Sequence, residues 1–212
     1  MLNDLLKTLD EQYNLKEISN ETTKVSKMNF IIRQYYAQGL GNVSTMEAKM
    51  PLGIMKMDTL IVNPFEIDLP LFSYDRVMAM GNDSLYAEIF ETRIDTSDKP
   101  EYVKELCNLK GPYDFEVKPT WYEDILYKES IHKKTKKRNS KDLDEVTKKF
   151  FNTYLKWSKE AKTCDINLKK QKAKVYTEGL LSNGGPSTDV FIKEKGREYT
   201  EELFRTKLFA TE

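Results

Sequence analysis

One carboxylate lies inside a stretch that otherwise has the composition of a protein core. Asp75 falls in the run SYDRVMAM at residues 73–80, with Phe72 and Val77 close to it. A carboxyl group beside apolar neighbours loses hydration, which raises its pKa and lets it hold a proton near neutral pH. Asp75 is therefore either a proton donor in a pocket or a solvated carboxylate paired with Arg76. The local pattern alone favours the solvated alternative.

Three further side chains could take part in such chemistry. Glu47 lies in a strand expected at residues 43–50, and Asp58 and Thr59 lie next to each other in one expected at 55–62. Each could face a pocket, and Glu47 could equally be a surface residue paired with Lys49. Either Thr59 or Asp58 could bond a ring oxygen of a ligand or an ordered water molecule.

His132 is the only histidine of the chain. If residues 130–134 form a strand, alternation places His132 and Lys134 on one face. His132 would then face the pocket together with Lys134. The alternative is that His132 is exposed beside a lysine-rich loop. A single histidine excludes a multi-histidine metal site, and Cys107 and Cys164 lack the spacing of metal ligands. We expect both cysteines to be reduced thiols and no metal to be bound.

Composition excludes several classes of function. Lys and Arg number 34 and Asp and Glu also 34, so no overall charge attracts nucleic acid or an anionic membrane. No apolar run approaches the roughly 20 residues that span a bilayer. The N-terminal segment lacks the basic start of a signal peptide. We expect a cytoplasmic monomer.

The periodicity predicts an amphipathic helix, then consecutive strands with short turns, then helices. Short turns between strands indicate an antiparallel meander, and helices on both faces make a three-layer α/β/α sandwich formed by a single domain, residues 1–212. The strands are expected at 24–37, 43–50, 55–62, 73–80 and 84–91, with a further strand near 130–134. The helices are expected at 2–17, 99–110, 143–160 and 166–181, followed by a final helix or a pair split near Gly196. Within 143–160, the stripe of Phe150, Tyr154 and Trp157 predicts a core-facing side.

Three segments, in order, carry a family resemblance. They are DLPLFSYD at 68–75, KPTWYEDILYKES at 118–130, and the C-terminal run at 183–209. Together they resemble the ferredoxin-dependent bilin reductases, which reduce linear tetrapyrroles such as biliverdin. The red chlorophyll catabolite reductases are similar to that family, so the resemblance indicates the fold more firmly than the substrate.

The resemblance implies a chemistry without a bound cofactor. Enzymes of this family hold no metal, flavin or nicotinamide; reduced ferredoxin delivers electrons directly to the bound bilin, and side chains supply protons. It implies that Asp75 is the proton donor, Glu47 a second catalytic group, Lys134 a cation that grips a propionate, and Thr59 or Asp58 a substrate contact.

Two departures narrow the expected reaction. Some members carry a histidine where this chain has Asp58 or Thr59, and an acidic residue near the turn that here begins at Asn183. This chain has neither the histidine nor the acidic residue, so it lacks a second proton donor at these positions. We therefore expect a two-electron reduction.

A basic run follows the expected strand near 130–134. The resemblance gives it a role in docking acidic ferredoxin by charge steering, and a solvated loop is the alternative. Nucleic-acid binding is disfavoured because no aromatic residue interrupts the run. The cations are Lys133, Lys134, Lys136, Lys137 and Arg138, with Lys169, Lys170, Lys172 and Lys174 as an extension of the surface.

Three alternatives stay open at this stage. The chain could reduce another open-chain tetrapyrrole, such as a chlorophyll catabolite. It could bind a bilin without turnover, or it could be an unrelated interaction domain.

Overall fold

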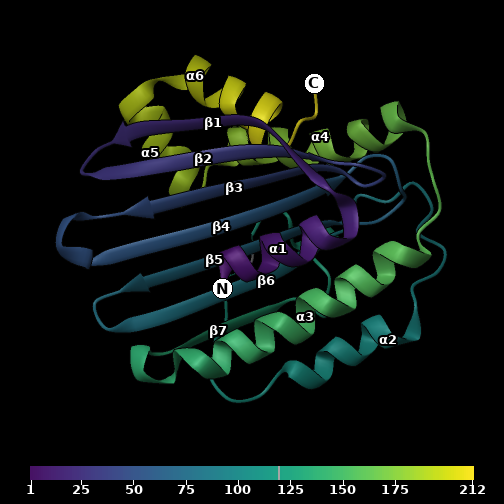
Figure 1. The fold of residues 1–212 in the computed structure, drawn as a ribbon, viewed down its shortest axis with the longest axis horizontal. Coiled ribbons are helices and arrows are strands. Elements are labelled where there is room, and N and C mark those ends of the chain that lie inside the picture. Colours follow the sequence, from purple (N-terminus) through teal and green to yellow (C-terminus); the bar gives the residue numbers. More distant parts are fainter. Residues whose placement is uncertain (119) are drawn as a thin grey trace.

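One antiparallel sheet organises the fold, and its seven strands follow one another in chain order (Figure 1). The computed structural model describes residues 1–118 and 120–212. Residue 119, which belongs to the motif at 118–130, lies outside the described residues. The strands are β1 (Leu15–Val25), β2 (Met28–Ala37), β3 (Gly41–Lys49), β4 (Met55–Pro64), β5 (Leu71–Ala79), β6 (Asn82–Phe90) and β7 (Ile131–Lys136).

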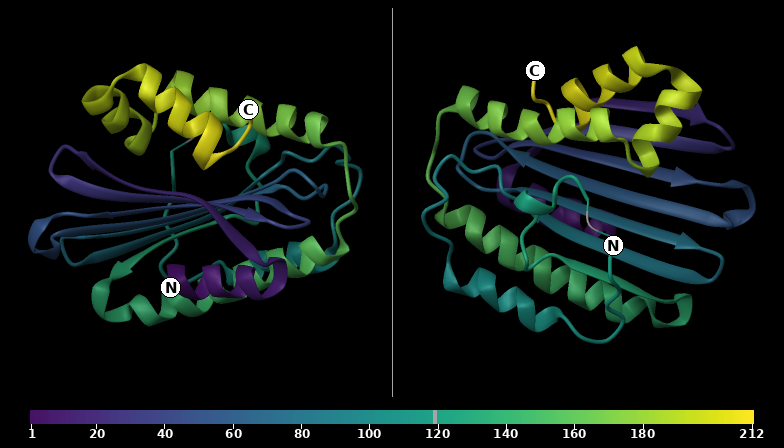
Figure 2. Two further views of the ribbon diagram at one scale, coloured as in Figure 1. Left: turned by 45° about the horizontal axis from the view of Figure 1, so that its top comes forward. Right: turned by 180° about the vertical axis from the view of Figure 1, so that it is seen from behind.

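Helices cover both faces of this sheet (Figure 2), which confirms the predicted three-layer α/β/α sandwich. On one face lie α1 (Leu2–Tyr13), α2 (Glu101–Lys104) with its 3-10 continuation Glu105–Leu109, and α3 (Ser140–Glu160). On the other lie α4 (Ile166–Asn183), α5 (Pro186–Lys195), and α6 (Arg197–Glu202) with the π-helical turn Leu203–Leu208. Short 3-10 turns occupy Pro51–Gly53, Glu123–Ile125 and Lys137–Asn139.

Alternation along the strands feeds two separate apolar cores. Phe72 points to the α1 and α3 side, where its ring centroid lies 6.1 Å from that of Phe150 and 5.0 Å from that of Tyr154. These rings and Trp157 are buried, so the predicted stripe is confirmed as core. In the second core, alternate residues of β2, β3 and β4 pack against α4, α5 and the C-terminal turn.

The first strand was absent from the sequence prediction. Asn14 has a left-handed conformation (φ 50°) that ends α1 after Tyr13, so the helix is shorter than the expected 2–17. β1 then pairs with β2 along residues 15 to 25. It lies at the edge of the sheet, where polar side chains are tolerated, and so its sequence LKEISNETTKV lacks the apolar run of a central strand.

Among the residues that the structure describes, no helix is long and apolar enough to cross a membrane.

Candidate functional site

Four side chains stand in one row across the strands β4 to β7. Thr59 pairs with Asp75, Asp75 with Tyr86, and Tyr86 with His132. The register between β5 and β6 is set by a two-residue turn at Met80 and Gly81, both with positive φ (50° and 74°). This row lies on the face covered by α4, α5 and α6, because Met46, its neighbour across β3, belongs to the core beneath those helices.

Asp75 is a carboxyl group with a strongly perturbed environment. Its pKa is raised from 3.8 to about 6, mainly by burial and to a smaller extent by the charge of Glu88. Two hydroxyl groups oppose this rise by donating to the carboxylate: Thr59 Oγ1 lies 2.5 Å from Oδ1, and Ser73 Oγ lies 3.3 Å from Oδ2. Asp75 can therefore hold and release a proton close to neutral pH, which is the alternative that the local sequence pattern did not favour.

Thr59, and not Asp58, is the residue of β4 that meets Asp75. Its side chain is buried and donates the 2.5 Å hydrogen bond described above. The pairing of β4 with β5 thus settles the one-residue ambiguity that the sequence left open.

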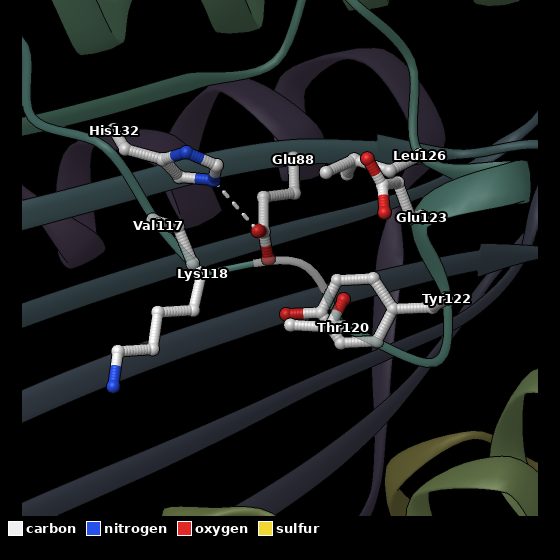
Figure 3. Close-up of a pocket in the computed structure, with 8 residues that line it drawn as sticks. All are labelled: Glu88, Val117, Lys118, Thr120, Tyr122, Glu123, Leu126 and His132. Carbon is white, nitrogen blue, oxygen red and sulfur yellow. Dashed lines mark hydrogen bonds and ion pairs between the residues drawn. The ribbon is translucent and has the colours of Figure 1, made fainter.

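Glu88 is part of this site and was not found by sequence reasoning. It pairs across β5 and β6 with Ser73, and its Oε1 lies 2.8 Å from Nε2 of His132 (Figure 3). Glu88 is buried and His132 is half-buried. The sequence does place Glu88 two residues after Tyr86, so the two side chains share a face of the strand. This spacing points to the site only once the hairpin register is known.

An open cleft lies beside the Glu88–His132 pair (Figure 3). Its volume is about 130 Å³, and it is partly open to solvent. Asp75 does not line the cleft. In the sheet, Tyr86 stands between Asp75 and His132. The lining residues are Glu88, Val117, Lys118, Thr120, Tyr122, Glu123, Leu126 and His132.

The described residues between 117 and 126 form the outer wall of the cleft, and Trp121 and Tyr122 lie between the sheet and α4. The ring of Tyr122 lies edge-on to that of Phe90 at 5.3 Å. Trp121 packs 5.6 Å from Tyr176 and presses onto Gly179, where an added Cβ would lie 2.1 Å from the indole ring. The described part of the motif at 118–130 therefore walls the site.

Glu47 and Asp58 do not join this site. They pair with each other across β3 and β4 and lie on the opposite face of the sheet, one residue out of phase with Met46 and Thr59. Glu47 contacts Arg33 at 2.7 Å, and buried Asp58 contacts Lys56 at 2.5 Å. The expectation that these two carboxylates share a pocket with Asp75 is wrong, because strand alternation points them away from it.

The basic run splits between the two faces of β7. Lys134 and His132 share a face, as predicted, and Lys134 is exposed. Lys133 points to the other side, where it is buried and contacts Asp114 at 2.5 Å. Lys169 is also buried and donates to the carbonyl oxygen of Thr92 at 2.7 Å. Neither Lys133 nor Lys169 is available for docking, in contrast to the expectation; Lys136, Lys137 and Arg138 are exposed.

Within residues 1–118 and 120–212, no three His, Cys, Asp or Glu side chains are grouped so that they could hold a metal ion.

The sheet between two helical layers is the fold of the bilin reductases. A particular structure of this fold is phytochromobilin synthase from tomato, solved in complex with biliverdin. It superposes with a TM-score of 0.74 and 12% sequence identity, covering 99% of this chain and 82% of that chain. No protein-family model matches the sequence, and no curated protein matches it.

Proposed function

We propose that this chain reduces a linear tetrapyrrole of the biliverdin type, with electrons from reduced ferredoxin and protons from its own side chains. The observation that carries the proposal is Asp75, a carboxyl group with a pKa near 6, on the sheet face that also bears His132 and Lys134. The tomato protein of the same fold was solved with biliverdin, which supports a bilin as the substrate class.

The open part of this sheet face suits a flat, largely apolar ligand. Val77, Tyr86 and Tyr122 are each partly exposed, and they offer apolar and aromatic surface around Asp75 and the cleft. Small-molecule sites typically enclose roughly 300–1,000 Å³. The cleft has a volume of about 130 Å³, so a bilin would lie largely over the open sheet face beside it. Lys134, exposed on the same face, is the cation that would bind a propionate group.

The proposed reaction is the reduction of one double bond. It consumes two electrons, delivered singly by two molecules of ferredoxin, and two protons. An added electron makes the tetrapyrrole more basic, so a neighbouring carboxylic acid can protonate it. Asp75 fits this role because its pKa of about 6 leaves an appreciable protonated fraction near neutral pH.

Exposed cations next to the site supply a docking surface for ferredoxin. Lys136, Lys137 and Arg138 follow Lys134 at the end of β7 and in the adjoining turn. Positive charges steer an acidic partner and increase the rate of encounter. A ferredoxin bound here would lie near His132 and the cleft.

Absorption spectroscopy tests the proposal. Purified protein is mixed with biliverdin, and reduced ferredoxin is then added without oxygen. We expect a shifted visible spectrum on mixing and conversion to a reduced bilin after ferredoxin is added. A shifted spectrum that ferredoxin leaves unchanged would instead indicate a bilin carrier. No shift with biliverdin would contradict the proposal, and a shift with an open-chain chlorophyll catabolite alone would assign that compound as the substrate.

A further inference from the structure

Two hairpin turns carry apolar side chains that stand in solvent. Leu52 lies in the β3–β4 turn and Met80 in the β5–β6 turn. They are 96% and 88% exposed, more than any other large apolar side chain of the described residues. Ile54, in the first of these turns, is 54% exposed. An apolar side chain stabilises a fold by leaving water, so folding does not account for these three.

The backbone makes apolar residues at these positions more unusual. Leu52 and Met80 have positive φ (62° and 50°), and each precedes a glycine that also has positive φ, Gly53 (66°) and Gly81 (74°). Asparagine, aspartate or glycine is the common residue before such a glycine, because most side chains are strained in the left-handed region. The β1–β2 turn has polar Ser26 in this conformation (φ 55°). Strain that folding does not require points to a function at the surface.

The β3–β4 and β5–β6 turns are neighbours at one end of the sheet (Figure 1). Met55, at the end of the first turn, pairs with Ala79, at the start of the second. We call Leu52, Ile54 and Met80 the apolar tip. Neither turn, at 50–55 or at 79–82, contains an acidic residue.

Exposed cations border the apolar tip on the β7 side. Lys136 pairs with Asn82, next to the β5–β6 turn, and the backbone amide of Lys137 donates to the carbonyl oxygen of Gly81 at 3.0 Å. Arg138 follows and is also exposed. These three cations form the surface proposed above for ferredoxin, so the apolar tip is continuous with that surface.

We propose that the apolar tip is the centre of the ferredoxin docking surface and that Lys136, Lys137 and Arg138 are its basic rim. The inference rests on the proposed function, because the partner is the electron donor named there. Protein interfaces commonly have an apolar centre and a polar, charged rim. The rim attracts an acidic partner, and the apolar tip holds an apolar patch of that partner after the encounter.

The position of the tip suits an electron donor. Ala79, at the base of the β5–β6 turn, follows Asp75 by four residues of β5, which is roughly 13 Å along the strand. Val77 lies between them, half-buried and on the face that bears Asp75. A ferredoxin on the apolar tip would therefore lie close to a tetrapyrrole bound over that face.

Binding of oxidised plant-type ferredoxin to biliverdin-loaded protein tests the inference without turnover. Isothermal titration calorimetry gives the Kd in low and in high salt. Met80→Asn and Leu52→Asn each place asparagine before glycine. We expect each to raise the Kd about fivefold, by the same factor in both salt concentrations, because salt screens charges and leaves apolar contacts in place. Lys137→Glu should raise the Kd mainly in low salt.

Thermal unfolding separates docking from damage to the fold. Both asparagine variants should unfold at or above the wild-type temperature, because asparagine adopts positive φ more readily than leucine or methionine. Val175→Asn is the matched control, since Val175 is 70% exposed on α4, away from both turns. It should leave the Kd unchanged.

Three results would overturn the inference. A wild-type Kd in both Met80→Asn and Leu52→Asn, with normal reduction of biliverdin by wild type, would overturn it alone. A wild-type protein that neither binds ferredoxin nor reduces biliverdin would overturn the proposed function as well. Flotation with phosphatidylcholine–phosphatidylglycerol vesicles should show no binding; binding that Met80→Asn abolishes would assign the apolar tip to a membrane surface instead.

Discussion

Thr59 on β4 donates a hydrogen bond of 2.5 Å to Asp75 on β5. The bond favours the ionised carboxylate and so lowers the pKa of Asp75. Burial has the larger, opposite effect, and the resulting pKa is about 6. The neighbouring strand thus adjusts the pKa of the proposed proton donor toward neutral pH.

Replacing Thr59 by Val should raise the pKa of Asp75 above 6, because the hydroxyl that stabilises the charged form is lost. The alkaline limb of the pH–rate profile should move to higher pH, since the acid form persists further. The measurement is the profile of turnover against pH. Thr45→Val is the matched control. Thr45 is a buried threonine on the other face of the sheet, and its hydroxyl has no hydrogen-bond partner among the described residues. An unshifted limb in Thr59→Val would contradict this description of the site.

Asp75 should also make stability depend on pH. Its pKa is higher in the folded chain than the ordinary 3.8, so folding favours the protonated form. The favourable contribution is complete below pH 4 and is lost as pH rises through about 6. Asp75→Asn should therefore match wild type below pH 4 and exceed it at pH 8 by up to about 3 kcal/mol.

Urea unfolding of both proteins at several pH values measures this difference. Asp124→Asn, at an exposed position, should stay within about 0.5 kcal/mol of wild type throughout. A constant difference between Asp75→Asn and wild type across this pH range would show that Asp75 has an ordinary pKa.

The layers of the fold were predictable from sequence, whereas the membership of the site was only partly so. Alternation and short turns predict an antiparallel sheet, and the amphipathic stripe of α3 predicts its cover. Which face a strand residue occupies depends on register, and a slip of one residue exchanges the faces. For this reason His132 and Lys134 were placed correctly on one face, while the interpretation of Glu47 and Asp58 as pocket residues is wrong.

Other differences have local physical causes. Lys133 belongs to a run of cations, which suggests an exposed loop, yet strand alternation buries it against Asp114. Glu88 was passed over because no local pattern distinguishes it from a surface carboxylate. Only the hairpin register, which pairs Ser73 with Glu88, brings it next to Asp75.

Gly179 should be essential for the wall of the cleft. Alanine there would place its Cβ 2.1 Å from the Trp121 ring, so the indole or α4 must shift. We expect Gly179→Ala to destabilise the fold by about 1–3 kcal/mol and to weaken biliverdin binding. Thermal unfolding and a spectral titration measure both effects. Ser182→Ala, at an exposed position of the same helix, is the control; equal behaviour of the two variants would mean that Trp121 is not held by this contact.

Electron delivery should depend on the exposed cations that follow β7. Lys137→Glu should slow electron transfer from ferredoxin by about tenfold at low ionic strength, because it reverses a charge in the docking surface. The difference should shrink as salt screens the charges. Lys27→Glu, at an exposed position between β1 and β2 on the opposite edge of the sheet, gives the same change of net charge elsewhere. Equal slowing by both variants would place ferredoxin somewhere other than beside β7.

The most direct test of the central claim is a single turnover of protein-bound biliverdin with reduced ferredoxin, in wild type and in Asp75→Asn. Both proteins should shift the biliverdin spectrum equally on binding, since the amide keeps the shape of the side chain. Wild type should then form a reduced bilin, and Asp75→Asn should form it at least about 100-fold more slowly. Product formation by Asp75→Asn at the wild-type rate would contradict the assignment of Asp75 as the proton donor.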